Sequence, residues 1–143
     1  MGEFGLNATL AGHNGVPAVF IAGDAAVAAE ARALVPEIKT AVVKKGMGRY
    51  AAECLHPDKT GPLIRKTVSE ALASYEGIEP LRVETPVKLK VELVSATSAD
   101  AASTLPYVER LDGRTVAADF DDYPSAYRGF VGIFSMAGSA ERR

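Results

Sequence analysis

The sequence is poor in the residues that build disulfides, metal sites and membrane spans. It has one cysteine, two histidines and no tryptophan among 143 residues. A single cysteine cannot make an internal disulfide, which fits a reducing compartment. The longest apolar runs, 16–22 and 130–137, are too short to cross a bilayer, and the amino terminus lacks the basic and apolar regions of a signal peptide. We therefore expect a cytoplasmic protein that has no membrane partner.

An excess of charge of either sign is also missing. The 16 Lys and Arg residues nearly balance the 18 Asp and Glu residues, for a net charge of −2. The basic residues form no stripe of the kind that binds nucleic acid, so we expect no nucleic-acid partner. The hydrophobic share of 48% is that of an ordinary globular protein, and the length fits one domain.

Segments of helical and extended periodicity alternate along the chain. The predicted helices are 2–12, 25–34, 57–75 (or 61–75), 98–105 and 121–136. Asp24 is the expected cap of helix 25–34, and Ser98 is the expected cap of helix 98–105. The predicted strands are 17–22, 38–43, 87–94 and 108–120, the last being a strand or a hairpin. Apolar and polar residues alternate in 87–94, so this strand should have one wet face and one buried face. This order predicts the α/β class, with a mixed sheet and helices packed on it. We expect a single α/β domain over 1–143, with a possible sub-boundary near 79–86.

Familiar catalytic motifs are absent. The sequence has no HExxH, no paired CxxC, no phosphate-binding P-loop and no GxSxG. His13 and His56 lie far apart in the sequence, and each favours a surface or turn position. Cys54 follows apolar residues and favours a buried structural thiol. We therefore assign no catalytic residue.

Three acidic residues, Asp119, Asp121 and Asp122, cluster just before Pro124. Acidic side chains followed by proline are typical of a helix amino terminus, where they accept hydrogen bonds from free N–H groups. The spacing does not match an EF-hand loop. Helix capping is therefore the preferred interpretation over calcium binding.

A basic, glycine-containing segment, Lys44-Lys45-Gly46-Met47-Gly48-Arg49, follows the predicted strand 38–43. Glycines allow backbone amides to approach an anion, and Lys44 and Arg49 add positive charge, so the segment fits a carboxylate or phosphate site. A solvated loop that joins a strand to a helix fits equally well. Both interpretations stay open on these residues alone.

A series of short motifs runs through the first part of the chain: Gly2-Glu3-Phe4-Gly5-Leu6-Asn7-Ala8, Ala11-Gly12, Val16-Pro17, Ala22-Gly23-Asp24, Thr40-Ala41-Val42-Val43-Lys44, Arg49, Cys54-Leu55 and Pro57. Together these motifs resemble the D-aminopeptidases of dipeptide-transport operons, which are zinc metallopeptidases. The Gly-Glu-x-Gly-Leu-Asn run is the most specific of them. After about Pro86 the resemblance lies in the order of strands and helices.

The resemblance implies that the chain is the second half of a larger two-part α/β enzyme that releases D-amino acids from short peptides. It also implies a two-metal hydrolase. Glu3 is the one zinc ligand that carries over to this sequence. Asn7 lies one helical turn further and is expected to position the substrate or Glu3. Lys44 and Arg49 are expected to face Glu3 and to bind a peptide carboxylate.

The same resemblance assigns an Asp-x-Glu pair, two histidine ligands and a catalytic histidine to an amino-terminal half that these residues do not match. One carboxylate holds zinc only weakly. We therefore expect a truncated or split D-aminopeptidase, inactive alone, that forms a homo-oligomer or associates with the missing half. Short D-amino-acid peptides are its expected substrates once it is completed. The alternative is a non-catalytic binding or assembly domain derived from the family.

Overall fold

The structure, a computed structural model, describes residues 1–140 as two compact units. Unit 1 is Met1–Arg82, and unit 2 begins at Val83. The boundary falls within the 79–86 segment. Each unit contains its own three-stranded sheet and its own helices, so the predicted α/β class is confirmed, with the strands divided between two sheets.

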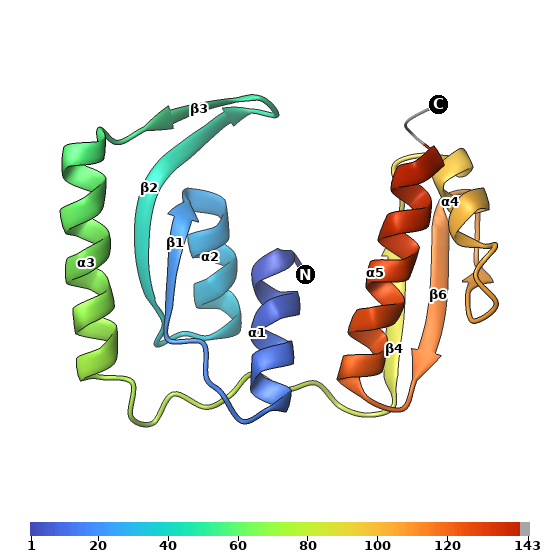
Figure 1. The fold of residues 1–143 in the computed structure, drawn as a ribbon, viewed down its shortest axis with the longest axis horizontal. Helices are drawn as coiled ribbons and strands as arrows, with labels where there is room; N and C mark the ends of the chain where they lie inside the picture. Colours follow the sequence, from blue (N-terminus) through green and yellow to red (C-terminus); the bar gives the residue numbers. More distant parts are fainter. Residues whose placement is uncertain (141–143) are drawn as a thin grey trace. The chain divides into compact units, whose positions relative to one another are not determined.

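Unit 1 combines parallel and antiparallel pairing in one sheet (Figure 1). Its elements are α1 (Glu3–His13), β1 (Phe20–Asp24), α2 (Ala25–Leu34), β2 (Lys39–Gly48), β3 (Ala51–Cys54) and α3 (Pro57–Ala73). The strand order is β1-β2-β3, with β1 parallel to β2 and β3 antiparallel to β2. Helices α2 and α3 both contact β1 and β2, and α1 packs on α2.

The passage from β1 into α2 is set by two adjacent residues. Asp24 is the amino-terminal cap of α2, and its carboxylate accepts a hydrogen bond of 2.9 Å from the N–H of Val27. A side chain at Gly23 would overlap that of Val27, so the strand turns into the helix with no room for a Cβ. The predicted cap and helix are confirmed.

The core of unit 1 lies between α1, α2 and the sheet. Its buried members are Phe4, Ala8, Ala31, Val35, Ile38 and Ile78. Helix α1 approaches α2 closely at Gly5, where a Cβ would overlap the Leu34 side chain of α2. Strand β1 is only half-buried along its whole length, although its apolar sequence predicts burial on both faces.

The basic segment is a hairpin, and the predicted strand-to-helix loop is wrong. Strand β2 continues through Lys44 to Gly48, and β3 returns along it, with Lys44 opposite Cys54. The partner strand supplies backbone hydrogen bonds that hold the glycine-containing segment extended. Only Arg49 and Tyr50 form the turn. All four residues of β3 are exposed, and its main contact is with β2, so the prediction of a buried Cys54 is also wrong.

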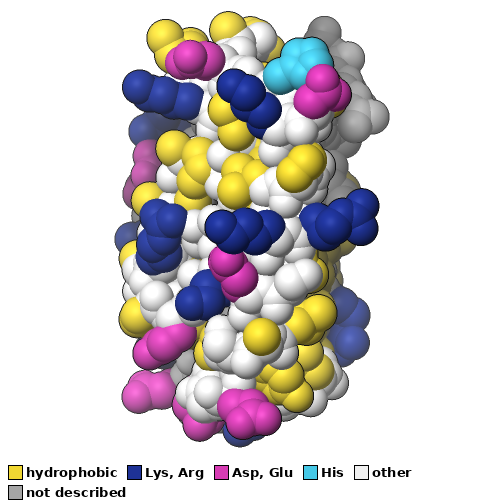
Figure 2. Space-filling model, turned by 90° about the vertical axis from the view of Figure 1, so that its left-hand side faces the viewer, with side chains coloured by type: hydrophobic (Ala, Val, Ile, Leu, Met, Phe, Trp, Pro, Cys, Tyr) yellow, Lys and Arg dark blue, Asp and Glu magenta, His cyan; other side chains and the backbone are white. Residues whose placement is uncertain are grey.

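The outer side of α3 is an ordinary charged surface. Figure 2 shows Lys and Arg side chains spread over this side of the molecule, with Asp and Glu and apolar side chains among them. Lys66 and Glu70 form an exposed pair at 3.8 Å along α3. This side therefore presents no patch of one charge sign.

Unit 2 is a purely antiparallel sheet with two helices. Its elements are β4 (Val87–Glu92), α4 (Ala96–Ala102), β5 (Glu109–Arg110), β6 (Thr115–Phe120) and α5 (Tyr123–Ala140). The strand order is β4-β6-β5. In β4, half-buried apolar residues alternate with exposed Lys88, Lys90 and Glu92, which confirms the predicted strand with one wet face. Both helices contact β6.

Unit 2 has a core of its own. Val116 and Ile133 are fully buried and pack with Ala99 and Ala102. The hydroxyl of Tyr107 donates to the carbonyl of Gly129 at 3.2 Å, and its ring meets Phe120 edge-on at 5.7 Å between centroids.

Two helix termini in unit 2 differ from the prediction, and one agrees. Ser95, rather than Ser98, caps α4 and accepts the N–H of Ser98 at 3.0 Å. Helix α5 passes through Gly138 to Ala140, so the predicted end at 136 is wrong; glycine in a helix lowers its stability without ending it. Asp122 accepts the N–H of Ser125 at 2.7 Å, which confirms its capping role. The capping prediction is wrong for Asp119, which lies in β6 opposite Lys88. Within residues 1–140, none of the helices has the length and hydropathy of a membrane-crossing segment.

Candidate functional site

The two residues of the Gly-Glu-x-Gly-Leu-Asn run that carry chemistry lie on one face of α1. Glu3 is the first residue of the helix and is exposed. Its negative charge in the first turn complements the helix dipole, a role that needs no ligand. The backbone N–H of Gly2 donates to Glu30 of α2 at 2.5 Å, which fixes the start of α1 on its neighbour. Asn7 follows Glu3 by one turn, so both side chains project to the same side.

Glu3 and Asn7 line an open groove of about 380 Å³, called the α1–β1 groove below. Its other lining residues are apolar and come from α1, β1, the approach to β1 and the first turn of α2. They are Phe4, Ala8, Ala11, Ala18, Phe20, Ile21 and Val27. The groove therefore has an apolar lining, with a carboxylate and an amide as its polar members.

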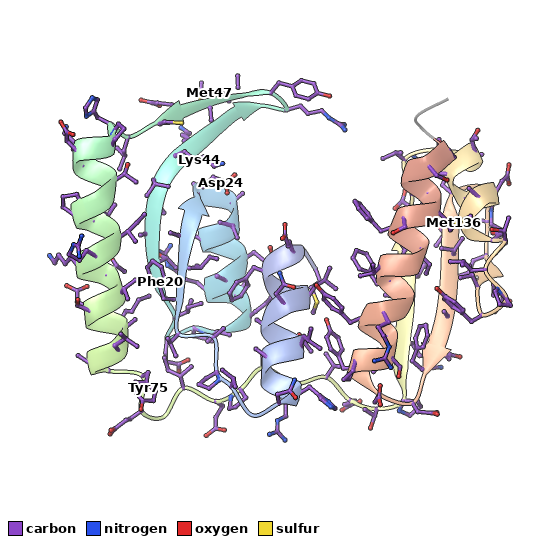
Figure 3. The ribbon with its side chains drawn as sticks, in the orientation of Figure 1. Phe20, Asp24, Lys44, Met47, Tyr75 and Met136 are labelled. Carbon is purple, nitrogen blue, oxygen red and sulfur yellow. The ribbon has the colours of Figure 1, made fainter. Side chains whose placement is uncertain are left out.

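Lys44 lies beside the carboxyl end of β1. It is exposed on β2 and is the register partner of Asp24, as Figure 3 shows for the two labelled residues. Arg49 lies in the hairpin turn, with its guanidinium 5.7 Å from the centre of the Tyr50 ring. Neither residue is among those that line the α1–β1 groove. The structure thus groups Glu3 with Asn7, and Lys44 with Asp24.

Asp24 caps α2 and belongs to the run Ala22-Gly23-Asp24 that resembles the family. Its carboxylate also stands at the end of an apolar parallel strand, the place where α/β proteins commonly bind ligands. The signal was present in the sequence, because a Gly-Asp pair directly follows the apolar run 17–22. The capping bond to Val27 accounts for one of its oxygens.

Both histidines occupy surface positions, as predicted. His13 is exposed in the last turn of α1. His56 is the amino-terminal cap of α3, and its Nδ1 accepts the backbone N–H of Asp58 at 3.3 Å. His56 therefore has a structural role as a helix cap.

A metal site is not formed by the residues that the structure describes. Among residues 1–140, no three His, Cys, Asp or Glu side chains stand close enough together to hold an ion. Protein zinc sites use three or four protein ligands. Glu3 and its neighbours on this chain therefore do not fit zinc by themselves.

A second hollow, in unit 2, is polar and internally paired. It is lined by Lys90, Glu92, Asp112, Arg114 and Thr115 and has a volume of about 520 Å³. Arg114 donates to Glu92 at 2.7 Å. Asp112 accepts the N–H groups of Arg114 and Thr115, both at 2.8 Å. These hydrogen bonds, that from Arg114 foremost, hold the pKa of Asp112 below its ordinary range. The charges stabilise the β5–β6 turn.

Comparison with known proteins finds two similar D-aminopeptidases. The D-aminopeptidase of Bacillus subtilis (strain 168) is 34% identical over 138 residues, which is 96% of this chain and 50% of that protein. The solved structure of the Zn-dependent D-aminopeptidase DppA from Bacillus subtilis, described as a self-compartmentalizing protease, matches with a TM-score of 0.90. That match also has 34% identity and covers 96% of this chain and 50% of DppA.

The chain thus spans about half the length of the relatives it matches. The predicted resemblance to the D-aminopeptidases is confirmed. Residues 1–131, which include Glu3, Asn7, all of unit 1 and most of unit 2, match the family model Peptidase_M55, D-aminopeptidase. The chain therefore belongs to the Peptidase_M55 family of D-aminopeptidases.

Proposed function

We propose that this chain is part of a D-aminopeptidase that releases amino-terminal D-amino acids from short peptides. In this proposal Glu3 is one zinc ligand, and the remaining ligands come from polypeptide outside these 143 residues. The observation that carries it is the position of the Gly-Glu-x-Gly-Leu-Asn run. It starts α1 and directs Glu3 and Asn7 to one groove. The lack of a ligand cluster within residues 1–140 is the reason for placing the other ligands elsewhere.

Each residue of the site has a distinct part in this proposal. Glu3 supplies a negative charge at an exposed helix start, where a second polypeptide can reach it. Asn7 either hydrogen-bonds the Glu3 carboxylate or positions the peptide, because its amide both donates and accepts. Lys44 and Arg49 bind the carboxylate of a short peptide, and both are exposed basic residues of the β2–β3 hairpin.

Assembly is part of the same proposal. DppA is described as self-compartmentalizing, and we extend association to this chain, either with further copies of itself or with the half that it does not match. A cytoplasmic location is proposed as well. It fits the exposed free thiol of Cys54, which a reducing compartment preserves.

The test is reconstitution of activity. The half of Bacillus subtilis D-aminopeptidase that this chain does not match is expressed separately and mixed with the chain and zinc. A D-alanyl peptide should be hydrolysed, and its L-isomer should react far more slowly. Glu3→Gln keeps the shape and removes the charge, so kcat/KM should fall at least about 100-fold. Lys44→Met should raise KM with little change in kcat.

The matched control is Glu37→Gln, which changes an exposed glutamate outside the groove and should leave turnover unchanged. Equal hydrolysis by the Glu3→Gln chain would show that the ligand assignment is wrong. The alternative function is a non-catalytic binding or assembly domain. The exposed hairpin favours it, since Tyr50 is 92% and Met47 67% exposed. A complex that forms without any hydrolysis of D-peptides would support this alternative.

A further inference from the structure

Strand β1 has a free edge. Within residues 1–140 the sheet of unit 1 has the order β1-β2-β3, so β1 pairs with a strand on one side only. The N–H of Lys39 on β2 donates to the carbonyl of Val19. Backbone groups alternate in direction along a strand, so those of Ile21 face β2. The N–H and C=O groups of Phe20 and Ala22 therefore point to the free edge.

The composition of β1 is unlike that of a natural edge strand. Edge strands usually carry charges, prolines or bulges that prevent another strand from pairing with them. The other edge strand, β3, follows this rule with Glu53 among its four residues, whereas a register shift occurs in the pairing of both β1 and β3 with β2. In β1 the residues Phe20–Gly23 are uncharged, and Asp24 is the only charged residue. Apolar parallel strands of this kind normally lie inside a sheet.

Helix α1 points to the same missing neighbour. Helix α2 contacts both β1 and β2, whereas the main contact of α1 is α2. A helix beside α2 on the same side extends past the last strand of the sheet. Its apolar residues Ala8 and Ala11 line the α1–β1 groove with Phe20 and Ile21 of the strand. One more strand along β1 would lie beneath α1 and fill this groove.

We propose that the polypeptide completing the site adds a strand along the free edge of β1 and places apolar side chains in the α1–β1 groove. Its identity is the ligand-bearing half of a D-aminopeptidase, since the relatives are about twice as long as this chain. Strand addition makes backbone hydrogen bonds at Phe20 and Ala22, and the groove makes the match specific. It also brings the incoming chain to Glu3 at the groove. This inference rests on the proposed function.

Hydrogen exchange tests the contact independently of catalysis. The chain is mixed with the non-matching half of Bacillus subtilis D-aminopeptidase and zinc. Amide exchange at Phe20 and Ala22 should slow at least about tenfold, while amides on the exposed side of α3 should not change. The Glu3→Gln chain should give the same protection on β1, because the added strand docks before zinc binds and does not require Glu3 as a zinc ligand.

Two variants sharpen the test. Ala22→Pro removes an N–H at the free edge and keeps the pairing with β2, so it should weaken association at least about tenfold. Ala11→Glu places a charge in the groove without changing β1 and should weaken association similarly. The matched control, Ala33→Glu, changes an exposed alanine of α2 outside the groove and should bind normally.

Four outcomes would overturn the inference. They are no association, association with unchanged exchange at Phe20 and Ala22, normal binding by the Ala11→Glu chain, and concentration-dependent protection of β1 in the chain alone. The last would identify a second copy as the occupant. Protection of β1 without Glu3-dependent hydrolysis would instead leave the inference standing and contradict the proposed function.

Discussion

Units 1 and 2 bury apolar residues in different ways. Unit 2 is closed around Val116 and Ile133, which are fully buried, and its strand β4 alternates half-buried apolar residues with exposed ones. Unit 1 is open: its most apolar strand lies half-buried at a sheet edge, beside a groove of about 380 Å³. The residues that resemble the family's site all belong to the open unit. The incompletely buried apolar surface of unit 1 therefore lies beside Glu3 and Asn7, the residues of the proposed zinc and substrate site.

Shortening a core side chain of unit 2 should have the largest effect. Ile133 is a fully buried residue of α5. Ile133→Ala leaves a cavity in place of its side chain and should lower the free energy of unfolding by about 2–5 kcal/mol. The loss should appear in the amide protection of unit 2, with unit 1 retained. Val131→Ala, at a residue 44% exposed on the same helix, is the control and should change stability by less than about 1 kcal/mol. Parallel loss of protection in both units would contradict their independence.

Filling a close approach in unit 1 should have the next largest effect. A Cβ at Gly12 would overlap the backbone carbonyl of Leu81, which cannot move as a side chain does. Gly12→Ala should therefore destabilise unit 1 by about 1–3 kcal/mol, as overpacking does. Thermal unfolding with exchange readout should place the loss in α1 and the segment near Leu81. The control is Gly48→Ala, because no other atom lies near a Cβ at that position. Equal destabilisation by the Gly12→Ala and Gly48→Ala variants would contradict the steric explanation.

The smallest expected effect is the acid sensitivity of the β5–β6 turn. The pKa of Asp112 is lowered in the folded chain, foremost by the N–H of Arg114. A carboxylate whose pKa is lowered in the folded chain stabilises the fold when the pH is above its pKa in the unfolded chain, which is about 3.9. This contribution is lost as the pH falls through the pKa of the folded chain. Thr115→Val removes a hydroxyl that also lowers this pKa, so an NMR titration should show the Asp112 pKa rising toward its ordinary range. Thr104→Val, at an exposed threonine outside this hollow, should leave the titration unchanged.

Local signals predicted most of the elements but not their partners. The Asp24 cap, the alternation in β4 and the capping by Asp122 depend on neighbours within a few residues, and the structure confirms them. The predictions of a loop at Lys44–Arg49 and of a buried Cys54 were wrong. The conformation of both depends on the pairing of β2 with β3, which the periodicity of the sequence did not reveal. Serine is a suitable helix cap at either Ser95 or Ser98. Ser95 is the cap because the backbone there is extended and the helix begins directly after it, at Ala96.

Residue types and their spacing are sufficient to predict the α/β class, the cap at Asp24 and the family motif around Glu3 and Asn7. These features depend on residues that are close together along the chain. The division of the strands into two sheets, and the position of β1 at the edge of one of them, come from tertiary packing. The same packing places Glu3 and Asn7 in a groove with Phe20 and Ile21, and Lys44 beside Asp24. Such neighbours are distant in sequence, and their contact depends on strand order and helix packing, which no local pattern encodes.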